Sequence, residues 1–456
     1  MNIPWGGDLA VQYIPWYWIA ADYLHSFSLP HWVPGIYDRG YPLLAEGETG
    51  ALSPINALLL FLFPFDLSIN LLFATYFLIA IGGVFYFLRT AGLGKAAAFL
   101  GGVVFGLSGF MVSRYFMPGV LFASALAPFG FWVVLKSVRD ASFVLFLPFV
   151  VYLQITAGHL QMTLISCLGY LAFIFFYLGK RKTGLFLAAR VTFAIVIGFG
   201  LAAPQILPSL KLFQISERRE WTREIRYSYS LPASHLITYI SPYYFGISEP
   251  GNNFGFMGFG GSFWEFNLTI WTVPLLLAFV GLTTLKGKGS RLTFALVLMW
   301  LVFILLSFGG YFKPYRIVGH LPDFPFRAPS RFLLINTFAI SSLAALGFEK
   351  LFAKRGPFLK ITAIGLIVGS IIFQQGAMFG KYYQFASWEE IKNSISDLTS
   401  YKMASPLYID PTIPVDSMYN SKTNVFADEF RKGTVIAVFS LGILYLWKVL
   451  LRRARH

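Results

Sequence analysis

Charged side chains are scarce in this chain of 456 residues: they make up 12% of it, against 56% for hydrophobic and 18% for aromatic residues. An ordinary soluble domain has about 25% charged residues. Apolar runs long enough to cross a bilayer, such as INLLFATYFLIAIGGVFYFL, recur along the sequence. Only a helix satisfies its own backbone hydrogen bonds in lipid, so these runs predict spanning helices. The predicted fold class is an all-α polytopic membrane protein.

Cysteine is nearly absent, since the chain has only Cys167, which lies inside an apolar run. A single cysteine excludes an internal disulfide framework and any metal site built from clustered cysteines. The sequence also lacks HExxH, GxSxG, Walker and zinc-ligand spacings. No catalytic chemistry that is defined by one of these motifs is therefore indicated.

The apolar runs predict eleven membrane spans, or twelve if a helix precedes this sequence. They lie near 67–88, 96–112, 120–135, 142–158, 162–179, 188–209, 268–285, 292–308, 332–350, 361–378 and 433–450. The predicted units are a first external loop with interfacial helices (1–66), six spans (67–209), an external loop (210–267), four spans with an external loop at 309–331 (268–378), a short external segment (379–432), and a last span with a basic tail (433–456).

The short connections between these spans alternate in charge. Six of them are basic: RTAGLGK, KSVRD, GKRKTG, KGKGSR, EKLFAKRGPFLK and the tail RRARH. Among these six, the only acidic residues are Asp140 and Glu349. The positive-inside rule makes the basic face cytoplasmic, so the large loops are predicted to be extracytoplasmic and the C-terminus cytoplasmic. Topology also accounts for the net charge of +15, which gives no reason to expect a nucleic-acid partner.

This topology places Met1 outside the cytoplasm, although MNIPWGGD has neither the basic nor the apolar region of a signal peptide. Either residues 9–24 insert into the membrane, or the native protein has one more helix upstream. We favour the second interpretation, because Gln12, Pro15 and Asp22 suit an interfacial amphipathic helix better than a span.

The centres of the predicted spans carry almost no ionisable residues. Arg190 and Lys448 lie near cytoplasmic ends, where their side chains can reach the membrane surface. Ion-coupled transporters usually place carboxylates or histidines near the midplane. The sequence therefore disfavours coupled transport and places the polar chemistry on the outer face.

Asp8 is the first candidate for that chemistry. It follows two glycines, which permit sharp turns and close approach of a ligand. An external carboxylate at the membrane surface could act as a general base on a sugar hydroxyl. The alternative interpretation is a helix cap for residues 9–24, because aspartate favours that position.

Four further charged residues lie in the same loop. Asp38 and Arg39 could bind substrate, the arginine through a phosphate, although such a pair is also common in solvated turns. Glu46 and Glu48 could join Asp8 and Asp38 as oxygen ligands of a divalent cation. No spacing enforces that site, so no cofactor is required.

Two segments far along the chain add further candidates for substrate binding. Arg327 and Arg331 lie just before a predicted span on the outer face, where anchoring cations are not expected, and could bind a lipid phosphate or pyrophosphate. His159 and Gln161, at an outer boundary between spans, could bond a phosphate or hydroxyl. A lone histidine at such a boundary is also often a packing residue.

The first loop resembles that of the bacterial YfhO-like membrane proteins, which are similar to the C-type glycosyltransferases. The shared features are Gly7-Asp8, Leu29-Pro30-His31-Trp32, Gly40-Tyr41-Pro42 and Ser53-Pro54-Ile55-Asn56. The AGHLQ and FRAPSRF runs are also similar, so the resemblance covers roughly residues 5–350. Two departures are the missing first helix and the short segment 379–432, where relatives often carry a large folded domain.

The resemblance implies a glycosyltransferase with an outer-face active site in the bacterial cytoplasmic membrane. Its donor would be a sugar on a polyprenyl phosphate, its acceptor a glycan or another cell-envelope molecule, and Asp8 its catalytic base. Arg327 and Arg331 would stabilise the leaving phosphate. The alternatives are a transporter or flippase for lipid-linked glycans, which needs no essential carboxylate, and a non-catalytic assembly protein.

Overall fold

The computed structural model describes residues 2–5, 7–36, 39–179, 181–216, 223–245, 263–286, 290–319, 326–379, 384–395, 414–419 and 424–453. Within these ranges, eight helices are long and apolar enough to cross a membrane. They contain α3 (Phe65–Thr90), α6 (Pro118–Ser137), α8 (Leu160–Leu178), α9 (Lys182–Leu201), α13 (Ser290–Ser307), α15 (Leu333–Phe352), α16 (Pro357–Phe379) and α18 (Val425–Arg453). This confirms the predicted class, an all-α polytopic protein.

Three shorter apolar helices coincide with the remaining predicted spans. They are α4 (Lys95–Gly106), η4 (Ala141–Phe146) continued by α7 (Leu147–Thr156), and α12 (Thr272–Leu282) continued by η8 (Thr283–Lys286). Further short helices are α2 (Pro54–Leu62), α5 (Gly109–Val112), α10 (Ala203–Gln214), α11 (Arg223–Tyr227), η6 (Ala233–Tyr239), η9 (Gly309–Tyr311), α14 (Lys313–Gly319), η10 (Pro329–Phe332), α17 (Trp388–Ile395) and η11 (Val415–Ser417).

The predicted span 188–209 is wrong as a single helix. Helix α9 ends at Leu201, and α10 begins at Ala203. Pro204 lies in the first turn of α10, where it has no N–H to donate to the carbonyl of Gly200. An uninterrupted helix across this position would lose that bond, and the chain starts a new helix instead.

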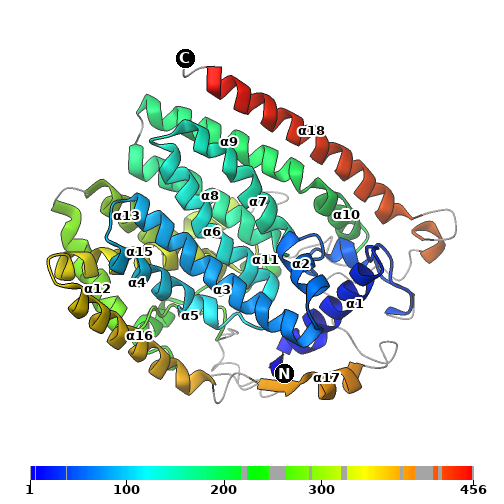
Figure 1. Cartoon of the computed structure of the whole chain (residues 1–456), viewed down its shortest axis with the longest axis horizontal. Coiled ribbons are helices and arrows are strands. Elements are labelled where there is room, and N and C mark those ends of the chain that lie inside the picture. The colour runs from blue at the N-terminus through cyan, green and yellow to red at the C-terminus, as the bar shows by residue number, and fades with distance from the viewer. Residues whose placement is uncertain are drawn as a thin grey trace.

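Helices α6 and α15 form the centre of the bundle and are buried along most of their length. Phe131 of α6 stacks on Phe338 of α15 with ring centroids 4.3 Å apart, and Phe87 of α3 meets Phe338 edge-on at 5.0 Å. Figure 1 shows α18 along one edge of the molecule and α16 along the opposite edge. These outer helices expose large apolar side chains, Phe373 at 85% and Phe439 at 70%, which a bilayer would cover.

The N-terminal helix differs from the expected interfacial amphipathic helix. A π-helical turn, η1 (Leu9–Tyr13), leads into α1 (Ile14–His25). Most of both segments is buried within the protein, including Trp16 and Tyr17. Because protein covers it on several sides, this helix fixes the position of the residues before it.

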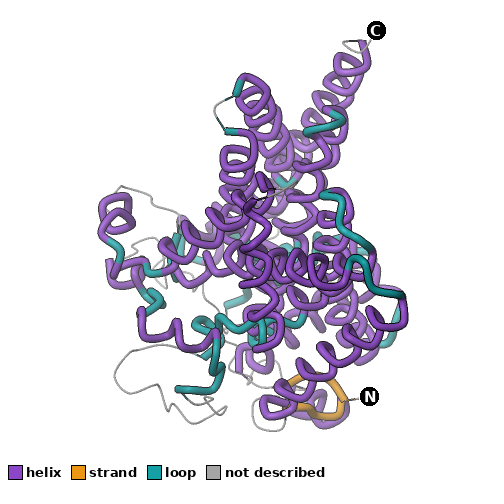
Figure 2. The backbone as a smooth tube through the Cα atoms, turned by 90° about the vertical axis from the view of Figure 1, so that its left-hand side faces the viewer, coloured by secondary structure: helices purple, strands orange, loops and turns teal. Residues whose placement is uncertain are grey.

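The N-terminal strand connects the first loop to the segment 379–432, which is predicted to be external. Strand β1 (Asn2–Trp5) pairs antiparallel with β2 (Gln384–Ser387), with Asn2 opposite Ser387. The two strands lie together close to the N-terminus (Figure 2). Another short loop element, η3 (Leu43–Glu46), packs against α10.

Candidate functional site

Asp8 immediately precedes η1, but its carboxylate does not cap the N-terminus of this helix as an aspartate often does. The preceding Gly7 has φ +54°, a left-handed conformation that favours glycine. Asp8 itself is already helical (φ −60°, ψ −26°) and its side chain makes no capping hydrogen bond. The alternative interpretation of Asp8 as a cap is therefore wrong for this structure.

The surroundings of Asp8 favour its protonated form more than water does. Burial raises its pKa to about 6, and the nearby Glu48 carboxylate adds to that shift, while Arg331 and Arg327 act against it. The residue still has an exposed surface, so solvent reaches a group that protein atoms partly surround. A carboxylate with a pKa close to neutrality suits proton transfer.

Glu48 is held in place by two residues of η1. Tyr13 donates a hydrogen bond of 2.6 Å to Glu48 Oε2, and Gln12 donates one of 3.1 Å to the same atom. Burial and the Glu48 charge raise the pKa of Tyr13 well above 10, so it remains a donor at neutral pH. The backbone of Glu48 also lies close to Gly158, next to His159.

Arg331 is the centre of a buried hydrogen-bond network. Its Nη1 lies 2.9 Å from His159 Nε2 and 3.5 Å from Gln161 Oε1. Since a guanidinium can only donate, Nε2 of His159 accepts and the imidazole is neutral, with its proton on Nδ1. Gln161 also donates to the backbone carbonyl of Arg327, which links the loop before α8 to the segment before α15.

Glu265 and Arg114 complete this network, and neither was among the predicted site residues. Glu265 Oε1 lies 3.2 Å from both Nε and Nη2 of Arg331, and its Oε2 lies 2.9 Å from Arg114 Nη2. Ser330 donates a further bond of 3.0 Å to Oε2. All three charged side chains are buried. Of this network, Arg331 is close enough to Asp8 to lower its pKa, as does Arg327.

Burial alone would raise the pKa of Glu265, but the charges of Arg331 and Arg114 and the hydrogen bonds from Arg114 and Ser330 lower it below the ordinary value of 4.5. Glu265 is therefore ionised at neutral pH. Its bidentate contact fixes the plane of the Arg331 guanidinium. The remaining Nη1 is thereby directed toward His159 and Gln161.

The sequence carried one signal for the two missed residues. Arg114 and Glu265 are isolated charges in aromatic-rich runs, SRYFMP and SFWEFN. A buried charge needs a partner of opposite sign, and in such a charge-poor chain two isolated charges on the same predicted face are candidates for pairing. The sequence does not show that Arg331 shares the same carboxylate.

The structure brings together five of the seven predicted site residues. Asp8, His159, Gln161, Arg327 and Arg331 lie in one cluster, linked by the hydrogen bonds and charge interactions above. The role of each stays a prediction. Arg39 is exposed in the first loop and is not among the charges that shift the pKa of Asp8.

The remaining predicted residue, Asp38, lies outside the described residues. The possible cation site would include Asp38 and is therefore not tested as a whole; among the described residues, no group of three or more histidine, cysteine, aspartate or glutamate side chains could hold a metal. Glu46 instead accepts a hydrogen bond from Tyr41 within the first loop.

The chain matches no known family model and no curated protein. The resemblance of the first loop to YfhO-like proteins therefore stays a prediction. The cluster around Asp8 combines a carboxylate whose pKa lies near neutrality with two arginines. Such an arrangement can accept a proton and hold an anion on the same side of the bundle.

Proposed function

We propose that this membrane protein is a glycosyltransferase that moves a sugar from a polyprenyl-phosphate donor to a hydroxyl of a cell-envelope acceptor. The single observation that carries the proposal is the environment of Asp8. Its carboxylate is uncapped, has a pKa of about 6, and lies within electrostatic reach of Arg327 and Arg331. A base beside an anion-binding pair is what this transfer requires.

The reaction is a single displacement. Asp8 takes the proton from the acceptor hydroxyl, and the oxygen forms a bond to the anomeric carbon. The bond between that carbon and the phosphate oxygen breaks, and the phosphate leaves with the electron pair. Arg327 and Arg331 stabilise the charge that develops on this phosphate.

The buried network supports the proposal by orienting Arg331. Glu265 occupies its Nε and Nη2 atoms, while His159 and Gln161 lie at Nη1. Because its nitrogens are engaged in this way, Arg331 would act on the phosphate mainly through its positive charge, which is held in a fixed position and needs little rearrangement as charge develops. Glu265 is then a positioning residue rather than a catalytic one.

The test is transfer of a labelled sugar from a polyprenyl-phosphate pool in membrane vesicles. Asp8→Asn should lower the transfer rate by about 10²-fold or more, the contribution typical of a general base. The matched control is Asp22→Asn, an exposed aspartate of α1, which should leave the rate unchanged. Equal rates for wild type and Asp8→Asn would contradict the proposed base. If the folded wild-type protein transfers no sugar, a transporter, a flippase or a non-catalytic assembly protein becomes the better account.

A further inference from the structure

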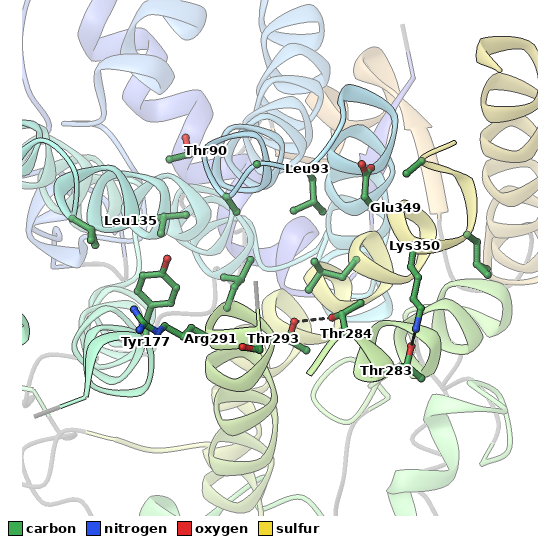
Figure 3. Close-up of a pocket in the computed structure, with 18 of the residues that line it drawn as sticks. Thr90, Leu93, Leu135, Tyr177, Thr283, Thr284, Arg291, Thr293, Glu349 and Lys350 are labelled. Atoms are coloured by element: carbon green, nitrogen blue, oxygen red, sulfur yellow. Dashed lines mark hydrogen bonds between the residues drawn. The ribbon is translucent and has the colours of Figure 1, made fainter. Parts of the chain in front are cut away.

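A second polar region lies at the far end of the bundle from Asp8. Arg331 precedes the first turn of α15, and Lys350 lies in its last turn. At 1.5 Å per residue, about 28 Å of helix separates them, which is close to the thickness of a bilayer's hydrocarbon core. Around Lys350 the structure contains a cavity of about 1020 Å³ (Figure 3).

The walls of this cavity are strongly basic. Five cations line it against one carboxylate: Arg139, Arg291, Lys350, Lys354, Arg355 and, as the carboxylate, Glu349. Glu349 accepts a hydrogen bond of 3.2 Å from the backbone N–H of Gly94 at the start of α4, which occupies one of its carboxylate oxygens. Within the described ranges, none of the five cations forms an ion pair. The cavity therefore has a large excess of positive charge.

Hydroxyl groups and aliphatic side chains form the rest of the wall. Thr284 and Thr293 share a hydrogen bond of 2.8 Å, and Lys350 donates to Thr283 (Figure 3). Leu135 and Leu292 lie among the apolar lining residues. The cavity is thus amphipathic, with donors for an anion beside a surface suited to hydrocarbon.

We propose that this cavity binds the phosphate group of an anionic lipid headgroup, with the adjoining acyl chains against its leucines. Arginine, lysine and hydroxyl groups are the usual donors to phosphate oxygens. The excess charge selects an anionic over a zwitterionic headgroup. The apolar lining favours a lipid over free phosphate. Free phosphate carries the same anionic group but has no acyl chain that could contact the leucines. The site lies at the other end of α15 from Asp8 and does not depend on the proposed transfer reaction.

The test is the retention of lipid by the purified full chain. The protein is reconstituted in nanodiscs of phosphatidylcholine with an equal share of phosphatidylglycerol, extracted into mild detergent, and its bound lipid is measured by native mass spectrometry. One charge-assisted hydrogen bond contributes about a factor of ten in affinity. We expect at least about a tenfold preference for phosphatidylglycerol, and its loss in the triple variant Arg291→Gln, Lys354→Gln, Arg355→Gln.

The matched control is Arg181→Gln with Lys182→Gln, two cations at the start of α9 that do not line the cavity. This control should retain the wild-type preference. Equal retention of both lipids by wild type would overturn the proposal, as would an equal loss in the control and the triple variant. The wild-type comparison stands even if the triple variant fails to fold. Displacement of phosphatidylglycerol by millimolar inorganic phosphate would identify free phosphate as the ligand and overturn the lipid assignment.

Discussion

Loss of Glu265 should destabilise the fold strongly. It is the counter-charge of two buried arginines, and its lowered pKa means that it stabilises the folded state at neutral pH. That stabilisation is present above the unfolded-state pKa of about 4.5 and is lost as the pH falls through the lower folded-state pKa.

Replacing Glu265 with glutamine keeps the size of the side chain and removes its charge. Arg114 and Arg331 would then be buried without a counter-charge, which costs about 3–5 kcal/mol of folding free energy. Thermal unfolding in detergent should show a clearly lower midpoint for Glu265→Gln at pH 7. The matched control is Asp428→Asn, whose partner Arg431 is 78% exposed, and it should unfold close to wild type. If both variants unfold alike, the buried network does not stabilise the protein.

Individual site residues were predictable to different degrees. Asp8, Arg327 and Arg331 stood out because they are charges in polar or glycine-rich turns of an apolar chain. Glu265 gave only the weaker signal of an isolated charge, because its importance depends on which arginines reach it in three dimensions. The competing cap function of Asp8 could be rejected only from its backbone and its hydrogen bonds.

At the scale of elements, α12 and α15 pack with their backbones in close contact. A Cβ added at Gly281 would collide with the backbone of Leu343, and one added at Gly347 would collide with the backbone of Leu277. Small residues let helices in membranes approach this closely. The glycines are therefore required by packing between these helices rather than by a turn.

Gly347→Ala should destabilise the protein by about 1–3 kcal/mol, because a backbone cannot move aside as a flexible side chain can. The yield of folded protein after detergent extraction and its unfolding midpoint would both fall. Gly369→Ala on α16 is the matched control, since nothing lies within 4 Å of a Cβ there. It should be neutral or slightly stabilising, as alanine favours helices over glycine. An equal effect of both substitutions would contradict the close contact of α12 and α15.

The positions of the helices were predictable where hydrophobicity alone determines them. Long apolar runs gave the helices, but their ends depend on local chemistry, as the break before Pro204 shows. The span predicted near 268–285 lies within a few residues of α12 and η8, of which α12 starts at Thr272. The burial of the N-terminal segment could not be predicted, because its polar residues suit an interface, whereas tertiary packing covers most of it; its position at the membrane surface stays a prediction.

At the scale of the whole molecule, the predicted topology places Asp8 outside the cytoplasm and the basic cavity inside. Cys167 is buried, so cysteines introduced at exposed positions can be labelled selectively. An impermeant maleimide should label Ser234→Cys, in the predicted external loop, in intact cells. It should label Lys354→Cys only after the membrane is opened. The reverse pattern would invert the topology, and labelling of both in intact cells would contradict the placement of the two sites on opposite sides.

The assembly of the candidate site could not be predicted from the sequence. Asp8, Glu48, His159, Glu265 and Arg331 lie in five segments that the packing of the helix ends brings together. Sequence patterns predicted that these segments share one face of the membrane. They did not show which side chains would meet, because no local period relates segments so far apart.

The measurement that tests the account most directly is the pH dependence of the transfer rate between pH 5 and 8. The pKa of Asp8 is raised to about 6, so the base is protonated below that value and free above it. The account predicts a rate that rises about fivefold from pH 5 to pH 6, where it is half-maximal, and becomes constant above about pH 7. A rate that is constant from pH 5 to 8 would show that no group with this pKa controls transfer, and would contradict Asp8 as the base.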